Sequence, residues 1–430
     1  GQSFTTKEGK GDGISLRLTN TSLRGKNVEA YQLDITGTGI VIAGTDASGV
    51  FYGVQSLLSL IPVDVYLQKK QEVLFEQVNI EDAPRFDFRS LHLDLARNFQ
   101  SKETVMKILD LLASYKLNHI LFYTTEDEGW RVEIDGLPEL TSVGAERKHV
   151  SGMKAAALHP AYGSGPTTDF KNGHGSGYYS KADFVEILKF AAARHITVIP
   201  VINFPGHARA AIKSMESRYQ RLKSEGKDQE AEEFRLIDPH DSSLYISAQG
   251  YKDNVVDVTR ESTYRFFEKV VDGLTALYKE AGLTMKKIHI GGDEVPDAAW
   301  TKSPNAQNLL RENPDIKNTK NLHPYFIRRL LPVLKKKNLE VHGWEEIALI
   351  KTPEGKYVSN PEFVKDKLVP YIWNNVFDPD LGYRLANSGY PIVLCNVTNT
   401  YFDLAYSNDP KEPGLYWGGF VDTWDSYAFA

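Results

Sequence analysis

Two adjacent acids, Asp293 and Glu294, are the residues of this chain whose type and position best suit catalysis. They follow an alternating apolar segment, 287–290, which predicts a strand, and a glycine pair, Gly291 and Gly292. A turn at the glycines lets two consecutive carboxylates reach one cavity at different depths. Two carboxylates at a strand end can deliver a proton and stabilise a cation, as a hydrolase requires. For an isolated Asp-Glu pair, the simpler interpretation is that the acids open a helix after a strand.

Other polar and aromatic residues occupy the corresponding place after other predicted strands. They are Arg97, Glu126, Asp127, Glu128, His207, Trp344, Trp373, Tyr401 and Asp403. In a parallel barrel, the carboxyl ends of all strands meet at one rim, where active sites lie. Taken singly, a surface ion pair explains Arg97 and core packing explains a tryptophan. Their joint placement favours a site.

The elements that must position these residues alternate between strand and helix. Strands are predicted at 91–95, 119–123, 197–204, 287–290, 339–344, 369–373 and 391–397, and helices at 104–115, 184–195 and 264–281. This alternation predicts parallel strands joined by right-handed crossovers, an α/β fold. We expect a (β/α)8 barrel of the TIM type at 81–430, with seven strands visible and the eighth apparently missing from this chain. A Gly- and Pro-rich loop, 158–177, is expected to shape the entrance.

The first part of the chain, 1–80, predicts a small α+β domain. Strands are expected at 14–18, 30–35 and 39–43, and a helix at 49–61 that lies on them. Residues 81–86 are expected to form a linker. We expect this first domain to be incomplete and the barrel to be truncated at its C-terminus.

Composition excludes several classes of protein. The net charge of −6 and the lack of Lys/Arg blocks argue against nucleic-acid binding. No apolar run of about 18 residues occurs, so no membrane insertion is expected. The single Cys395 excludes an internal disulfide framework and leaves the compartment open.

Several short motifs together resemble glycoside hydrolase family 20, the β-N-acetylhexosaminidases. They are Asp82-Ala-Pro-Arg-Phe86, Leu93-Asp-Leu-Ala-Arg97-Asn-Phe99, Tyr115-Lys-Leu-Asn118, Gly129-Trp130-Arg131, Pro205-Gly-His207, His289-Ile-Gly-Gly-Asp-Glu294, Gly343-Trp344 and Tyr401-Phe-Asp403. The resemblance runs from about Glu29 to Trp417. Its Asp-Glu string is highly specific, and the other motifs are collinear with it.

The resemblance implies a retaining exo-glycosidase that removes terminal β-linked N-acetylhexosamine, with the substrate's 2-acetamido oxygen as nucleophile and an oxazolinium intermediate. It implies no cofactor and no metal. Glu294 would be the general acid and base, and Asp293 would orient the acetamido group and stabilise positive charge. The resemblance also implies that Tyr401 would hydrogen-bond the acetamido oxygen, that Trp344 and Trp373 would enclose the acetamido methyl group, and that Trp417 would stack on the sugar. Arg97 and Asp403 would bind ring hydroxyls. His207, oriented by Glu126, would hold Glu294.

Three features depart from the family pattern. Glu126 stands where the family usually has the orienting aspartate, and Asp127 follows it, so which of the two acts is left open. Segment 201–203, before Pro205, has no acid where the family commonly has one. The chain stops at Ala430, before the strand that normally brings another tryptophan and acid. We therefore expect weak or no activity from the 430-residue chain alone, which turnover of a p-nitrophenyl N-acetylglucosaminide at wild-type-like rates would contradict.

Three alternatives remain. A non-catalytic or impaired sugar-binding relative would keep the aromatic walls but lose the acid. A metal-dependent hydrolase would use histidines in or after strands, namely His92, His119, His207 and His289, although no paired-histidine helix motif occurs. A conventional two-carboxylate glycosidase is the nearest rival and would cleave substrates that lack the acetamido group.

The expected partner is a glycan that contains N-acetylhexosamine, and a homodimer is left open. A secreted or periplasmic protein is expected, although no export signal is present in this chain. The natural glycan, its linkage and the GlcNAc or GalNAc preference are not fixed by the sequence.

Overall fold

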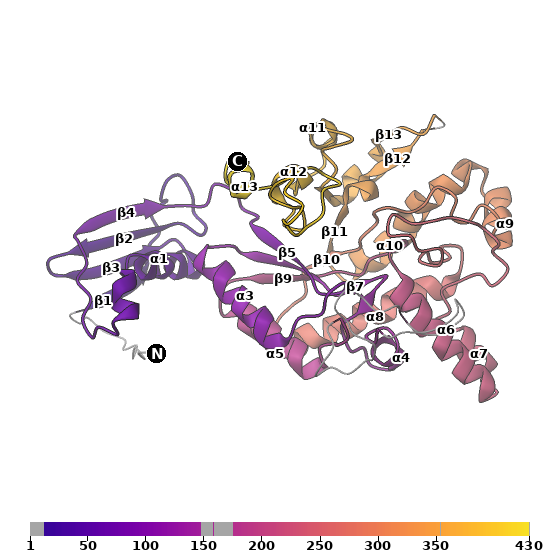
Figure 1. The fold of residues 1–430 in the computed structure, drawn as a ribbon, viewed down its shortest axis with the longest axis horizontal. Helices are drawn as coiled ribbons and strands as arrows, with labels where there is room; N and C mark the ends of the chain where they lie inside the picture. The colour runs from indigo at the N-terminus through magenta and orange to yellow at the C-terminus, as the bar shows by residue number, and fades with distance from the viewer. Residues whose placement is uncertain (1–12, 148–157, 159–174, 353, 430) are drawn as a thin grey trace. The chain divides into compact units, whose positions relative to one another are not determined.

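The computed structural model describes residues 13–147, 158, 175–352 and 354–429 (Figure 1). They form two compact units. The first contains the described residues up to Leu91 together with 103–120 and 189–198, and the second contains the others. Most of the entrance loop expected at 158–177, namely 159–174, lies outside the described residues.

The first unit is built on a four-stranded sheet with the order β1-β3-β2-β4. Its elements are β1 (Ile14–Leu18), β2 (Tyr31–Thr36), β3 (Gly39–Gly44), α1 (Ala47–Ser59), α2 (Val63–Leu67) and β4 (Val78–Asp82). Strand β1 is parallel to β3, whereas β2 is antiparallel to both β3 and β4. Helix α1 begins because Asp46 accepts the backbone N–H of Gly49 at 2.7 Å, an N-cap that satisfies a free donor. Helix α1 lies against β3 (Figure 1). Its Tyr52 belongs to the apolar core of this sheet, together with Leu33 and Ile42.

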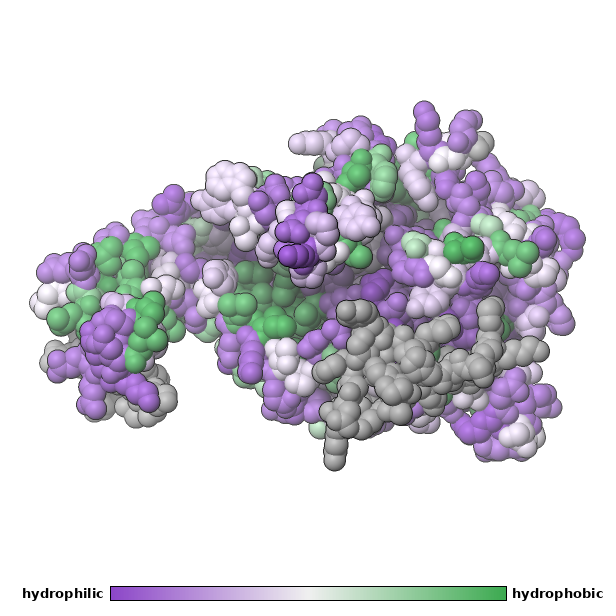
Figure 2. Space-filling model, viewed as in Figure 1, coloured by the Kyte–Doolittle hydropathy of each residue, from purple (hydrophilic) through white to green (hydrophobic). Residues whose placement is uncertain are grey.

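Two expectations for this unit are wrong in detail. The alternation of apolar and polar residues at 14–18 predicts a half-buried strand, and a linker is predicted from Glu81. All five residues of β1 are exposed, including Leu18 at 67%. This strand pairs at the sheet edge, and Figure 2 shows hydrophobic side chains on the surface of this sheet. The linker expected from Glu81 begins later, because Glu81 and Asp82 are the last residues of β4 and pair with β2.

Seven strands follow one another in chain order through the rest of the molecule. They are β5 (Ser90–Asp94), β6 (His119–Tyr123), β9 (Thr197–Pro200), β10 (Lys287–His289), β11 (Glu340–Trp344), β14 (Val369–Ile372) and β15 (Val393–Leu394). The first three are neighbours in one sheet, and the last four form a parallel sheet. A parallel bridge between Val201 and His289 connects β9 to β10. The strand ends after β5, β6, β9, β10, β11 and β14 carry the candidate residues.

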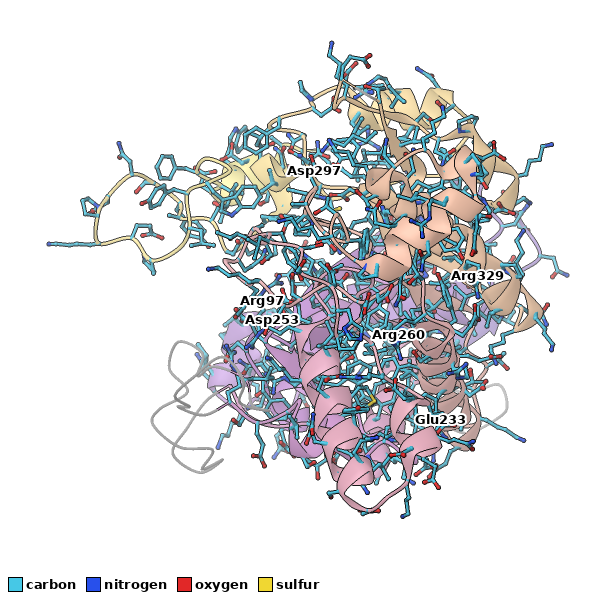
Figure 3. All side chains as sticks on the ribbon, turned by 90° about the vertical axis from the view of Figure 1, so that its right-hand side faces the viewer. Arg97, Glu233, Asp253, Arg260, Asp297 and Arg329 are labelled. Atoms are coloured by element: carbon cyan, nitrogen blue, oxygen red, sulfur yellow. The ribbon has the colours of Figure 1, made fainter. Side chains whose placement is uncertain are left out.

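Helices separate these strands, as α/β folds require. The longer ones are α3 (Lys102–Ser114), α5 (Lys181–Ala192), α6 (Arg209–Ser224), α8 (Glu261–Glu280), α9 (Pro304–Glu312), α10 (Leu322–Lys336) and α11 (Leu381–Asn387). The shorter elements are α4 (Glu139–Ser142), α7 (Asp228–Glu232), α12 (Val397–Thr400), α13 (Thr423–Tyr427), β7 (Thr125–Glu126), β8 (Gly129–Trp130), β12 (Leu349–Lys351), β13 (Tyr357–Ser359), η1 (Pro314–Ile316), η2 (Thr319–Asn321), η3 (Glu345–Ala348) and η4 (Pro361–Asp366). An ion pair of 2.8 Å joins Arg329 of α10, labelled in Figure 3, to Glu261 of α8.

The predicted strands are correct in position, but two are too long. Strand β9 ends at Pro200 rather than at Phe204. The strand expected at 391–397 is reduced to Val393–Leu394, since Asn396 accepts the N–H of Thr400 at 2.9 Å and the chain enters the helical turn α12.

Candidate active site

The glycine pair after β10 turns the chain as the sequence predicts. Gly291 and Gly292 have φ angles of +72° and +100°, and Glu294 follows at +50°. A Cβ on Gly291 would lie 1.7 Å from Oδ1 of Asn203, so only glycine fits there. A left-handed glutamate costs about 1–3 kcal/mol and is typical of functional sites.

Both acids of the pair lie beside one buried histidine. His207 Nε2 is 3.4 Å from Oδ2 of Asp293 and 3.3 Å from Oε2 of Glu294. The two carboxylates therefore converge on one point although they are consecutive in the chain. Gln249 donates its Nε2–H to Glu294 Oε2 at 2.8 Å. Oδ1 of Asp293 is buried and has no hydrogen-bond partner among the described residues.

The opposite edge of the His207 ring faces two more acids. Nδ1 is 2.7 Å from Oε1 of Glu126 and 3.3 Å from Oδ2 of Asp127. The longer glutamate thus reaches the histidine. Asp127 is also held by Asn254, at 2.9 Å, and by the backbone N–H of Arg209 at the start of α6.

Arg97 binds the same group of acids from the segment after β5 (labelled in Figure 3). Its guanidinium donates to Glu126 at 2.5 Å and to Asp94 at 2.8 Å. Asp94 also accepts the backbone N–H of Arg97 at 2.9 Å, which fixes the turn. Arg97 is partly exposed, with a side-chain accessibility of 35%, and a guanidinium has further N–H groups to offer.

The charges in this cluster follow from burial and from one another. Burial opposes a charged imidazole, but the carboxylates of Glu126 and Asp293 outweigh it and raise the pKa of His207 well above its ordinary value. Burial raises the pKa of Glu126 to about 7, although Arg97 and His207 act in the opposite direction. Burial also opposes ionisation of Asp293, but His207 lowers the pKa of this carboxyl below its ordinary value. The arrangement favours an ionised Asp293 beside a cationic His207.

The candidate aromatic residues form two separate groups of ring contacts. Trp344 is 5% exposed, and its ring centroid is 5.0 Å from that of His289 and 6.1 Å from that of Tyr371. Trp373 and Tyr401 each contact Trp417 edge-on, with centroids 6.1 Å apart.

Asp403 and Trp417 are the most exposed of the expected binding residues. Trp417 is 43% exposed, and Asp403 is also exposed. Burial nevertheless raises the pKa of Asp403, while Trp417 and Arg97 act in the opposite direction.

Sequence reasoning missed several residues that bind the expected ones. Gln249 lies in an irregular segment before α8, and no local pattern pointed to it. Asp94 lies within a motif that was recognised, but its bond to Arg97 was not foreseen. Glu345 and Glu346 directly follow Trp344, and both lie in contact with Trp373.

Two groups in this cluster have the geometry to hold a cation. They are Glu126 with Asp127 and His207, and His207 with Asp293 and Glu294. Both depend on His207, and a protonated imidazole cannot coordinate a metal. A cation could bind at either group only if His207 gave up its proton. His92, His119 and His289 belong to neither group among the described residues.

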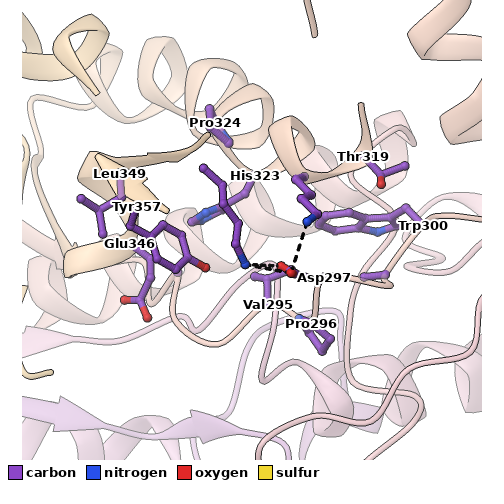
Figure 4. A pocket seen from close by; sticks show the side chains of 14 residues that line it. Val295, Pro296, Asp297, Trp300, Thr319, His323, Pro324, Glu346, Leu349 and Tyr357 are labelled. Atoms are coloured by element: carbon purple, nitrogen blue, oxygen red, sulfur yellow. Dashed lines mark hydrogen bonds and ion pairs between the residues drawn. The ribbon is translucent and has the colours of Figure 1, made fainter. Parts of the chain in front are cut away.

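A small cavity of about 40 Å3 borders the loop that carries the acid pair (Figure 4). Asp297 lies at its edge, paired with Lys351 at 2.7 Å and with Lys320 at 3.4 Å. Its wall also includes His323, Glu346 and other residues. A cavity of this size holds a few waters rather than a sugar ring.

The parallel strands and the acids that follow them define an α/β protein with a carboxylate site at the strand ends. The catalytic-domain model described as glycosyl hydrolase family 20 matches residues 86–430, and the model of domain 2 of that family matches residues 2–83. The chain belongs to glycosyl hydrolase family 20. Its predicted fold class, a TIM-type α/β barrel preceded by a small α+β domain, is confirmed.

Similar proteins carry related names. A β-hexosaminidase of Vibrio vulnificus is 39% identical over 424 residues, which are 97% of this chain and 48% of that protein. An N,N'-diacetylchitobiase of Vibrio harveyi is 38% identical, over 93% of this chain and 47% of that protein. The chain thus spans about half the length of these curated relatives.

Two solved structures of proteins with related names are also similar to this chain. The exo-β-N-acetylglucosaminidase of Vibrio harveyi in complex with N-acetylglucosamine has a TM-score of 0.76 and 31% identity, and the match covers 96% of this chain and 56% of that one. A β-N-acetylhexosaminidase of Bacteroides fragilis has a TM-score of 0.70 and 25% identity, with 96% and 69% covered.

Proposed function

We propose that the protein is an exo-acting β-N-acetylhexosaminidase that works with retention and with help from its substrate. The observation that carries the proposal is the convergence of Asp293 and Glu294 on His207, at 3.4 and 3.3 Å. The free, buried Oδ1 of Asp293 can accept the N–H of a substrate's 2-acetamido group. The names of the Vibrio relatives support the same substrate class.

In the first step, the carbonyl oxygen of the 2-acetamido group attacks the anomeric carbon. The bond from that carbon to the leaving oxygen breaks, and Glu294 gives its proton to that oxygen. The product is an oxazolinium ion, whose positive charge Asp293 stabilises from close range. In the second step, Glu294 takes a proton from water, which attacks the same carbon and reopens the ring with net retention.

The other residues bind and position the sugar. Tyr401 would donate its hydroxyl to the acetamido oxygen, and Trp344 and Trp373 would enclose the methyl group. Trp417 would stack on a sugar face, for which an exposed indole is suited. Arg97 and Asp403 would bind ring hydroxyls.

His207 acts through the two acids. Because Glu126 fixes its Nδ1 edge at 2.7 Å, its Nε2 edge is held toward Asp293 and Glu294. We therefore assign the orienting role to Glu126, the nearer acid at Nδ1, whereas Asp127 divides its contacts among His207, Asn254 and Arg209.

The choice of substrate tests this proposal. The natural full-length protein should hydrolyse p-nitrophenyl N-acetyl-β-glucosaminide at least about 10³-fold better, in kcat/KM, than p-nitrophenyl β-glucoside, because only the former carries the nucleophile. Comparable rates on both would favour a conventional two-carboxylate glycosidase. Binding without turnover would favour a sugar-binding relative, and inactivation by a chelator would favour a metal enzyme.

We also propose that the protein acts outside the cytoplasm on glycans that contain N-acetylhexosamine. A polymeric glycan is too large to cross the cytoplasmic membrane intact, so a substrate of that kind would require an exported enzyme. No helix in the part of the chain that the structure describes is long and apolar enough to cross a bilayer. Cell fractionation of the source organism tests the location.

A further inference from the structure

Two further acids hold the tryptophan wall of the proposed sugar pocket. Glu345 and Glu346 open η3, directly after Trp344. Glu345 is 3% exposed, and its Oε2 accepts the backbone N–H of Trp373 at 2.9 Å and that of Asn374 at 3.2 Å. Glu346 Oε2 accepts the indole Nε1–H of Trp373 at 3.4 Å. The backbone and the ring of Trp373 are thus bound separately.

We infer that Glu346 is a positioning residue that sets the tilt of the Trp373 indole and thereby the room for the substrate's 2-acyl group. This inference rests on the proposed function. Of these two acids, Glu345 binds the backbone of Trp373 and Glu346 binds its ring. An aromatic ring with its backbone fixed can still rotate about two side-chain bonds, and a hydrogen bond to the indole nitrogen restricts that rotation.

The surroundings of Glu346 favour the uncharged form of its carboxyl group. Burial, with Glu345 and Asp293 nearby, raises the pKa of Glu346 well above its ordinary value. An uncharged carboxyl still accepts a hydrogen bond through its carbonyl oxygen. Glutamine has the same shape and the same carbonyl acceptor, so it should replace Glu346 at this position.

Two features of the surroundings determine what a change in the tilt of the Trp373 ring would affect. Trp373 lies against Trp417, which lies against Tyr401, at centroid distances of 6.1 Å each. A change at Trp373 can therefore reach the tyrosine assigned to the acetamido oxygen. Glu346 also lines the cavity in Figure 4, so truncation of its side chain enlarges an existing space instead of being filled by neighbours.

The test is selectivity between 2-acyl groups, measured in the natural full-length protein. The ratio of kcat/KM for p-nitrophenyl N-acetyl- and N-butyryl-β-glucosaminide should fall roughly 3- to 10-fold in Glu346→Ala, because one or two methylene groups are discriminated by 10- to 200-fold in a tight pocket. In Glu346→Gln, the ratio should stay within about twofold of the parent value, because the acceptor remains. A purely structural loss would lower both rates together, so an unchanged ratio in Glu346→Ala overturns the inference.

A second variant separates the ring contact from general damage. Trp373→Phe removes the indole N–H and keeps an aromatic wall, so it should also lower the ratio. Adding Glu346→Ala to Trp373→Phe should then change the ratio less than about twofold, as expected of two partners in one interaction. An unchanged ratio in Trp373→Phe would overturn the inference even if Glu346→Ala fails to fold.

A glutamate elsewhere serves as the matched control. Glu362 of η4 pairs with Arg328 at 2.5 Å on the surface, and Glu362→Ala should leave the ratio at the parent value. If the parent protein fails to hydrolyse the N-acetyl substrate, the proposed function itself is wrong. If the parent is active and the ratio in Glu346→Ala is unchanged, only the inference is wrong.

Discussion

At the scale of single residues, one histidine organises the site. Four carboxylates lie within 3.4 Å of His207, two on each edge of its ring. A cationic imidazole between two acid pairs balances part of their charge in a buried setting, where isolated charges are costly. The same cation keeps Asp293 ionised, as the stabilisation of an oxazolinium ion requires.

The proposed role of Glu294 as general acid can be tested with a variant that has no acidic proton at this position. Glu294→Gln should lower kcat/KM about 10³-fold on an N-acetylglucosaminide with a poor leaving group, because general acid catalysis contributes 10²- to 10⁴-fold. The loss should be smaller with 2,4-dinitrophenol as the leaving group, which needs little protonation. Equal losses on both substrates would contradict the assignment of Glu294 as the acid.

The proposed role of Asp293 is electrostatic, and it predicts a different dependence of the rate on the leaving group. Asp293→Asn keeps the shape but removes the charge, and should lower kcat about 10²- to 10³-fold. The loss should be similar for good and poor leaving groups, since no proton is delivered from this residue. A loss that depends on the leaving group as steeply as in Glu294→Gln would count against this assignment.

At the scale of elements, the loop after β10 places both acids. Gly291→Ala should destabilise the fold by several kcal/mol, because its Cβ would overlap Asn203 and its φ is +72°. Gly282 has a similar φ, +76°, and nothing lies within 4 Å of its Cβ position. Gly282→Ala should therefore cost only about 1–2 kcal/mol. Urea unfolding of both variants measures the difference, and equal losses would show that the close approach to Asn203 does not matter.

Strand β10 also contributes a buried histidine that makes stability depend on pH. Burial, followed by nearby His342, lowers the pKa of His289 well below 6.5. The unfolded chain therefore takes up a proton near pH 6.5 that the folded chain does not, and stability falls as the pH falls below that value. The slope from this group is at most about 1.4 kcal/mol per pH unit.

Thermal unfolding at pH 7, 6 and 5 tests this dependence. His289→Asn keeps a hydrogen-bond acceptor for Gly291 but does not titrate, so the fall in Tm between pH 7 and pH 5 should be smaller than in the parent. An equally steep fall in the variant would show that other groups cause the acid sensitivity.

Local patterns predicted the elements well and their ends less well. A short apolar run located the strand at His119–Tyr123, and the alternation of Ile288 and Ile290 with His289 located β10. It could not show that β9 stops at Pro200, since apolar residues continue after the ladder ends. The turn at Asn396 depends on two backbone hydrogen bonds to its carbonyl oxygen, from Asn399 and Thr400, and leaves no periodic signal.

At the scale of the whole molecule, the site is assembled from segments far apart in the chain. Arg97, Glu126, His207 and Asp293 come from four different strand ends, and parallel topology alone predicts that these meet. Residues that approach from irregular loops, such as Gln249, could not be predicted, because no topology rule places them. The roles proposed for these residues come from the family resemblance, and the distances between them come from the structure.

The central claim is that the substrate's own amide attacks the anomeric carbon, and it predicts a dependence on the basicity of that amide. The measurement is kcat/KM of the natural full-length protein for p-nitrophenyl 2-deoxy-β-glucosides that carry N-acetyl, N-fluoroacetyl, N-difluoroacetyl and N-trifluoroacetyl groups. Each fluorine withdraws electrons from the carbonyl oxygen, so the rate should fall at every step, by at least about 10²-fold over the series, a barrier increase of about 2.7 kcal/mol. A rate that stays constant across the four substrates would show that another group is the nucleophile.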